Sequence, residues 1–223
     1  MQIVILAAGE GVRMRPLTLD TPKPLLKVGG VPLLDRIFKS LPQEIDEAII
    51  VVRYLGDKIK EHCGSEFHGR RVIYAEGSPL GNAYSFLAAK PYLESDRFVL
   101  VQGDEFLDRE DFMNCLKHNL SVLCLTLPDP WNHGVARLRA DGSIAEIFEK
   151  PKEDAGSMIV NGLMVLNQNI FQYEPRKNQN GEFYFTSMLN QFVKDEKVMA
   201  VPAKRSIGGI STPADIKRVE KLL

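Results

Sequence analysis

Short apolar runs bounded by glycine and polar residues dominate the first hundred positions of the chain. The run at residues 3–6 is rich in β-branched side chains and stops at Gly9 and Gly11, which predicts a buried strand followed by a glycine turn. Apolar residues at helical spacing follow Pro32. The same reasoning predicts strands at 48–52, 72–75 and 98–101 and helices at 32–41, 55–62 and 82–93.

The second half of the chain has a different pattern. Residues 135–138 and 144–148 alternate like the arms of a hairpin that turns at Asp141 and Gly142. Thr212 is placed to cap a closing helix that begins at Pro213. Further strands are predicted at 122–127, 158–166 and 198–201, and a further helix at 186–193.

This order of elements predicts an α/β protein. Four strands that alternate with helices favour a Rossmann-like, doubly wound and mainly parallel sheet, and the later hairpin makes that sheet mixed. No segment is rich enough in glycine, proline or serine to act as a linker, so residues 1–223 are expected to form a single domain.

Composition and charge exclude several classes of protein. With 28 basic and 29 acidic side chains the net charge is −1, so a nucleic-acid-binding surface is not expected. No run approaches the roughly 20 apolar residues of a membrane span. The three cysteines form no CxxC pair, which argues against disulfides and structural zinc and favours a reducing, cytoplasmic location.

The segment after the first strand is the first candidate site. Its small residues and glycines allow backbone N–H groups to approach a bound phosphate closely, although such a turn can also be purely structural. The segment lacks the third glycine of a dinucleotide-binding fingerprint, which argues against a dehydrogenase. Pro22 and Pro24 restrict the backbone around Lys23, so its ammonium group can be held near this loop.

These residues resemble the signature of the sugar-1-phosphate nucleotidyltransferases. The resemblance covers 6–13, 16–18 and 22–25, and continues in the family's order over most of the chain at Glu76, Pro79, Leu80, Gly81, Gly103, Asp104, Phe148, Glu149, Lys150, Pro151, Val160 and Asn161. It implies the nucleotide-diphospho-sugar transferase fold, with the nucleotide held by about residues 1–110 and a sugar or acceptor lobe at about 111–223.

The resemblance also implies a reaction and its residues. A nucleoside monophosphate would pass from a nucleoside triphosphate to a sugar 1-phosphate, with release of pyrophosphate, in a magnesium-dependent enzyme for which a homodimer is possible. Arg13, Lys23 and Asp104 would be catalytic, and Asp104 would bind Mg²⁺. The nucleotide would contact Leu6, Ala7, Ala8, Gly9, Gly11, Arg13, Lys23, Glu76, Pro79, Gly81 and Gly103, and the sugar phosphate Gly134, Glu149, Lys150, Val160 and Asn161.

Some features leave alternatives open. The carboxylate of Glu76 suits guanine better than uracil or thymine, because it accepts hydrogen bonds and cannot donate them. Gly209 stands where the family usually has its second metal-binding aspartate, a loss for which Glu105, Asp108 or Glu182 could compensate, and Leu163 stands where a glycine is expected after Asn161. A nucleotide-binding regulator without full activity, and transfer to a phosphorylated acceptor that is not a sugar, therefore remain as alternatives.

Overall fold

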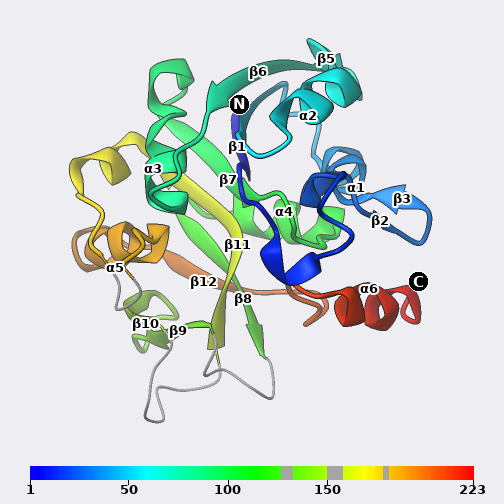
Figure 1. The fold of residues 1–223 in the computed structure, drawn as a ribbon. Coiled ribbons are helices and arrows are strands. Elements are labelled where there is room, and N and C mark those ends of the chain that lie inside the picture. Colours follow the sequence, from blue (N-terminus) through cyan, green and yellow to red (C-terminus); the bar gives the residue numbers. More distant parts are fainter. Residues whose placement is uncertain (127–132, 150–157, 178–180) are drawn as a thin grey trace.

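One mixed sheet runs through both halves of the chain (Figure 1). The computed structural model describes residues 1–126, 133–149, 158–177 and 181–223. The strand order is β10-β9-β11-β7-β1-β4-β6-β5, and β8 joins β11 to β12. The strands are β1 (Gln2–Ala7), β4 (Glu47–Val52), β5 (Glu66–Phe67), β6 (Arg70–Glu76), β7 (Arg97–Gln102), β8 (Ser121–Thr126), β9 (Gly134–Leu138), β10 (Ile144–Glu149), β11 (Met158–Asn167) and β12 (Met199–Pro202), with a separate pair β2 (Lys27–Val28) and β3 (Val31–Pro32).

The centre of the sheet is parallel, as the sequence predicts. β1 lies between β7 and β4, and Ile5 is in register with both Val101 and Ile50. All three side chains are fully buried, which agrees with the nearly continuous apolar runs of these strands. β11 is antiparallel to β7 and thereby carries the second half of the chain onto the same sheet. The α/β fold with one mixed sheet is confirmed.

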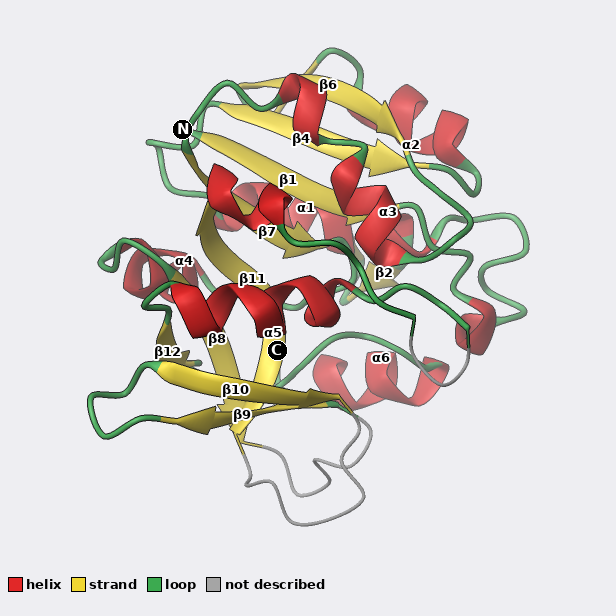
Figure 2. Ribbon diagram, turned by 90° about the vertical axis from the view of Figure 1, so that its left-hand side faces the viewer, coloured by secondary structure: helices red, strands yellow, loops and turns green. Residues whose placement is uncertain are grey.

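Helices cover both faces of the sheet (Figures 1 and 2). One apolar core packs α3 and α5 against the strands, and the other packs α1, α2 and α4 against the opposite face. Among the described residues, no helix is long and apolar enough to span a bilayer. The helices are α1 (Leu33–Ser40), α2 (Gly56–Cys63), α3 (Asn82–Leu87), α4 (Arg109–Leu116), α5 (Phe185–Asp195) and α6 (Pro213–Glu220).

Two helices differ from the sequence prediction. The helix expected over 82–93 ends at Leu87, and Lys90–Tyr92 forms a separate 3₁₀ turn around Pro91, because proline cannot donate to a continuing helix. α4 was not predicted, although Asp108 and Asp111 form a capping box at its start. The predicted cap of α6 at Thr212 is confirmed.

The three cysteines are buried and form no disulfide. Burial raises the pKa of Cys63, Cys115 and Cys124 to about 12 each, so the thiols stay protonated near neutral pH. They act as small apolar side chains in the core, as expected from their number and spacing.

The middle of β11 passes very close to the loop that follows β7. A Cβ added at Gly162 would lie 2.7 Å from Glu105 Oε1 and 2.9 Å from Glu105 Cγ, and 3.0 Å from Gln102 Cβ. All three separations are shorter than ordinary van der Waals contact, so only glycine fits this position without a shift of its neighbours.

We therefore expect Gly162→Ala to lower the free energy of unfolding by about 1–3 kcal/mol, because the new methyl group must displace the buried Glu105 side chain. Gly9→Ala is the matched control, since a Cβ at Gly9 would meet nothing within 4 Å. Denaturant unfolding of both variants checks this. Equal stability of the two variants would show that the approach of β11 to this loop is not as tight as described.

Candidate functional site

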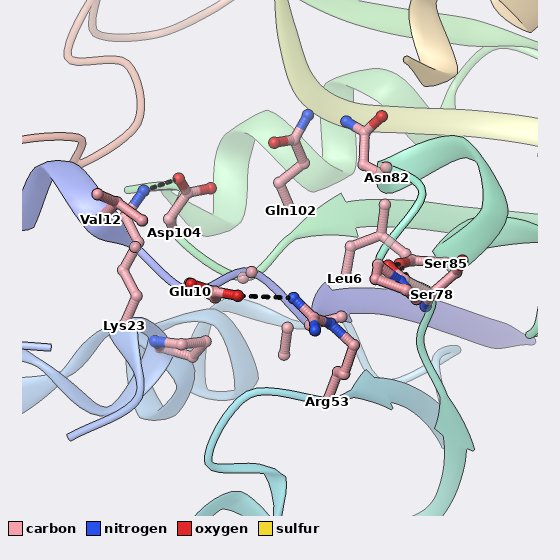
Figure 3. A pocket seen from close by; sticks show the side chains of 18 of the residues that line it. Leu6, Glu10, Val12, Lys23, Arg53, Ser78, Asn82, Ser85, Gln102 and Asp104 are labelled. Carbon is pink, nitrogen blue, oxygen red and sulfur yellow. Dashed lines mark hydrogen bonds and ion pairs between the residues drawn. The ribbon is translucent and has the colours of Figure 1, made fainter. Parts of the chain in front are cut away.

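A cavity of about 550 Å³ opens where β1, β4 and β7 end (Figure 3). Parallel strands present their carboxyl ends at one edge of a sheet, and ligands of open α/β sheets bind there. The residues that line the cavity are Leu6, Ala7, Ala8, Gly9, Glu10, Gly11, Val12, Arg13, Lys23, Pro24, Arg53, Ser78, Pro79, Gly81, Asn82, Ser85, Gln102, Gly103, Asp104, Glu182, Tyr184 and Ser211.

Gly11, whose backbone is in the left-handed region, and Thr18 set the shape of the loop after β1. Gly11 has φ +60°, and a Cβ there would lie 3.0 Å from Thr18 Cγ2 and 3.2 Å from Lys23 Cβ. The Thr18 hydroxyl donates a 2.8 Å hydrogen bond to the Gly11 carbonyl. Glycine is required at this turn, and the turn keeps the loop against the segment that carries Lys23.

Lys23 and Asp104 form an ion pair at one end of the cavity (Figure 3). Lys23 begins a 3₁₀ turn after Pro22, and only 14% of its side chain is exposed, against 22% for Asp104. The backbone before Asp104 is tied to the neighbouring strand β1, because the N–H of Gly103 donates a 2.9 Å hydrogen bond to Leu6 O. A cation and a carboxylate are thus fixed beside the glycine loop.

Arg13 reaches across the mouth of the cavity. Its Nη2 lies 3.5 Å from Ser211 Oγ, at the limit of a hydrogen bond, and its side chain is exposed. The contact joins the glycine loop to the segment before α6, which also lines the cavity. Arg13 therefore lies where a group bound at this end of the cavity can meet it.

Glu105 is a buried carboxylate beneath this end of the cavity. It is 6% exposed; Oε2 accepts a 2.7 Å hydrogen bond from Asn161 Nδ2 and Oε1 a 3.2 Å bond from the N–H of Gly162. Burial, together with the neighbouring charge of Asp104, raises the pKa of Glu105 to about 7, against the opposing effect of those two hydrogen bonds and Lys23. The loop after β7 is thereby tied to β11.

The position of Gly209 is close to this carboxylate. A Cβ there would lie 3.5 Å from Glu105 Oε1, which is an ordinary contact, so an aspartate at this position would add a second acid beside Glu105. Of the other acids considered as replacements, Asp108 caps α4 and pairs with Arg205 at 3.1 Å, whereas Glu182 lines the cavity.

The prediction that Leu163 replaces the family's glycine is wrong, because the residue that directly follows Asn161 is Gly162. Gly162 is also the residue that the packing of Glu105 requires, as shown above. The chain therefore keeps a glycine at this step of β11.

The structure gathers most of the predicted nucleotide site and separates the predicted sugar site from it. Glu76 ends β6 with an exposed side chain and does not line the cavity. Gly134 and Glu149 lie opposite each other in the β9–β10 hairpin. Lys150 lies outside the described residues. The predicted residues that line the cavity are Leu6, Ala7, Ala8, Gly9, Gly11, Arg13, Lys23, Pro79, Gly81, Gly103 and Asp104, and those that do not are Glu76, Gly134, Glu149, Val160 and Asn161.

Several polar residues of the cavity were not predicted. Arg53 and Gln102 lie at the ends of strands that were predicted, so their position beside a ligand edge was a usable signal. Ser78 and Ser85 bond to each other, with 3.1 Å from the Ser78 N–H to Ser85 Oγ. Tyr184 arrives from the start of α5, and no local pattern indicates that contact.

The side chains that line the cavity supply only part of a magnesium site. In the described ranges, no group of three or more histidine, cysteine or acidic side chains is arranged to hold a metal. The half-buried carboxylate of Asp104 nevertheless borders the cavity. Mg²⁺ keeps several waters and commonly binds through one or two carboxylates together with substrate phosphates, so Asp104 fits an ion that arrives with a nucleotide.

Known proteins match this chain over most of its length. A D-glycero-alpha-D-manno-heptose 1-phosphate guanylyltransferase of Campylobacter jejuni is 31% identical over 176 residues, which cover 77% of this chain and 78% of that protein. The bifunctional protein GlmU of Methanocaldococcus jannaschii is 28% identical over 225 residues, which cover 100% of this chain and 54% of that protein. The chain thus spans about half the length of its GlmU relatives.

A solved structure has the same fold. A putative glucose-1-phosphate thymidylyltransferase from Bacillus anthracis superimposes with a TM-score of 0.83 at 28% identity, and covers 100% of this chain and 94% of its own. The family model described as "Nucleotidyl transferase" matches residues 2–208. With the glycine loop, Lys23 and Asp104 joined at one edge of this sheet, the chain belongs to the nucleotidyl transferase family that includes the sugar-1-phosphate nucleotidyltransferases.

Proposed function

We propose that the protein transfers a nucleoside monophosphate from a nucleoside triphosphate to a sugar 1-phosphate and releases pyrophosphate. The observation that carries this proposal is the cavity at the carboxyl ends of β1 and β7, where the glycine loop meets the Lys23–Asp104 pair. The names of the relatives support it, since they include a heptose 1-phosphate guanylyltransferase and a glucose-1-phosphate uridylyltransferase.

The chemistry needs position and charge more than a protein base. An oxygen of the acceptor phosphate attacks the α-phosphorus, a new P–O bond forms there, and the bond to the bridging oxygen breaks so that pyrophosphate leaves with the electron pair. The attacking phosphate is already ionised near neutral pH. Lys23 and Arg13 offset the negative charge that shifts to the leaving group, and Lys23 does so from a position that its ion pair with Asp104 fixes.

Asp104 is the residue that we propose to hold Mg²⁺ with the triphosphate. The ion, when bound, would neutralise charge on the phosphate oxygens. Lys23 keeps the Asp104 carboxylate oriented toward the cavity, and the bond from the Ile210 N–H to Asp104 O, at 2.9 Å, fixes its backbone. Glu105 holds the same loop to β11 from below.

The sugar-binding residues would act from the second half of the chain. Asn161 donates to Glu105, and its Oδ1 accepts a 3.3 Å bond from the Leu163 N–H, so we propose that it acts by holding the loop of Asp104. The exposed carboxylate of Glu149, beside Gly134, would accept hydrogen bonds from sugar hydroxyl groups.

A nucleotide-binding regulator is the second candidate, and Gly209 is the observation that favours it. Calorimetry with triphosphate and Mg²⁺, followed by a pyrophosphate-release screen over sugar 1-phosphates, separates the two functions. We expect binding together with turnover for at least one acceptor. Tight binding without turnover over the whole panel would favour the regulator.

Replacement of Lys23 by methionine should lower the rate of pyrophosphate release by about 10²–10³-fold, because a fixed cation beside the reacting phosphates is lost. Lys27→Met is the matched control, since Lys27 is exposed and does not line the cavity. Steady-state kinetics on both variants measures the effect. Equal rates for the two would contradict the role given to Lys23.

Asp104→Asn should raise the Mg²⁺ concentration that gives half-maximal rate, because a neutral amide is a weaker ligand for this ion than a carboxylate. Titration of the rate with Mg²⁺ in wild type and variant measures the shift, and removal of divalent ions with a chelator should abolish release in both. A variant that saturates at the wild-type Mg²⁺ concentration would rule out Asp104 as the ligand.

Gly9→Ala should weaken triphosphate binding by about tenfold without loss of stability, because its Cβ would enter open space in the cavity where backbone amides approach the phosphates. Calorimetric titration gives the affinity and thermal unfolding the stability. An unchanged affinity would place the phosphates away from this part of the loop.

A further inference from the structure

Arg53 is a cation of the cavity with no part in the mechanism above. It directly follows β4, and its half-buried side chain lines the cavity together with Glu10 and Ser78 (Figure 3). Its Nη2 donates a 3.2 Å hydrogen bond to Glu10 Oε1. Within the part of the chain that the structure describes, its Nε is buried and has no hydrogen-bond partner.

The accessible part of the Arg53 side chain is open to a ligand, because 31% of the side chain is exposed and Arg53 lines the cavity. Nε itself is buried, so a ligand in the cavity meets the end of the guanidinium group. A guanidinium group has only donors, so whatever satisfies Arg53 must present an acceptor atom. The cavity beside Arg53 is where that acceptor would come from.

The sheet places Arg53 away from the phosphate end of the cavity. Asp104 lies beyond β7, on one side of β1, whereas Arg53 follows β4, on the other side. Val52 is in register with Ala7 and Glu76, so Arg53 emerges between the glycine loop and the segment around Ser78. Figure 3 shows this order, with the Lys23–Asp104 pair and Ser78 on opposite sides of Arg53 and Glu10.

The walls around Arg53 suit the uncharged end of a nucleotide. Ser78, Gly81 and Ser85 are small and uncharged there and Pro79 is apolar, so these four residues offer no positive charge to a phosphate. A triphosphate bound along Arg13, Lys23 and Asp104 therefore extends its base toward Arg53.

We propose that Arg53 reads the nucleobase and selects bases that present a carbonyl oxygen. Guanine offers O6 with N7, and uracil and thymine offer O4, all of which accept hydrogen bonds from a guanidinium group; adenine and cytosine carry amino donors at the corresponding positions. Glu10 holds the guanidinium in place through Nη2, and the part of the group that lines the cavity is left for the base. This inference rests on the proposed nucleotide site and names its substrate class: the triphosphates of guanosine, uridine and thymidine.

Binding titrations of Arg53→Met and of the wild type test the proposal. UTP, GTP, dTTP, ATP and CTP are titrated with Mg²⁺ and without acceptor, so that affinity is measured in the absence of turnover. The wild type should bind the first three about tenfold more tightly than ATP and CTP, and Arg53→Met should bring all five to within about threefold of each other.

Arg15→Met is the matched control. Arg15 approaches the same carboxylate, with Nη2 3.6 Å from Glu10 Oε2, but 45% of its side chain is exposed and it does not line the cavity. It should keep the wild-type preference. Thermal unfolding checks that each variant is folded, and Arg53→Lys, which keeps a donor, should show an intermediate preference if Arg53→Met does not fold.

Each other outcome overturns the assignment. An equal loss of affinity for all five triphosphates in Arg53→Met would mean that Arg53 contacts the ribose or the phosphates. The same loss in Arg15→Met would mean that both substitutions act through Glu10 and not through a contact between Arg53 and the base. If the wild-type protein bound ATP or CTP as tightly as the other three triphosphates, there would be no base preference for Arg53 to explain. A wild type that binds no triphosphate would refute the proposed function itself, which distinguishes that failure from failure of this inference.

Discussion

The common edge at which parallel strands β7, β1 and β4 end is the constraint on which the site depends. Residues far apart in the chain, Gly9, Arg53 and Asp104, each follow one of these strands and meet at one cavity for that reason. The strands are held in register by buried apolar side chains on both faces. A shift of one strand would move its polar residue away from the others, so the packing of the sheet sets the geometry of the site.

The two halves of the chain are joined at the same place by a buried carboxylate. Glu105 leaves the loop after β7 and bonds to Asn161 and Gly162 on β11, while the segment around Gly209 closes over it. Glycine at position 162 makes room for an acid that is costly to bury unless it is hydrogen-bonded. Glu105 directly follows Asp104 and bonds to β11. A ligand bound at Asp104 is therefore linked through Glu105 to the second half of the chain.

Sequence patterns predicted the central strands, the glycine loop and the neighbourhood of Lys23, because each depends on local signals: short apolar runs, glycines after a strand, and prolines around a cation. α4 was missed although its capping box was visible. The bond between Glu105 and Asn161 spans 56 positions and has no local signal. Arg53 is oriented by Glu10, 43 positions away in the sequence. The two residues meet because β1 and β4 are neighbours in the sheet, which no local pattern indicates.

A crystal structure with a non-hydrolysable nucleoside triphosphate and Mg²⁺ would show which residues contact each part of the nucleotide. We expect the triphosphate along the glycine loop, with Lys23 and Arg13 on its phosphates, the metal at Asp104 and the base beside Arg53. A nucleotide bound in the reverse direction, or bound elsewhere while this cavity holds only water, would contradict the account.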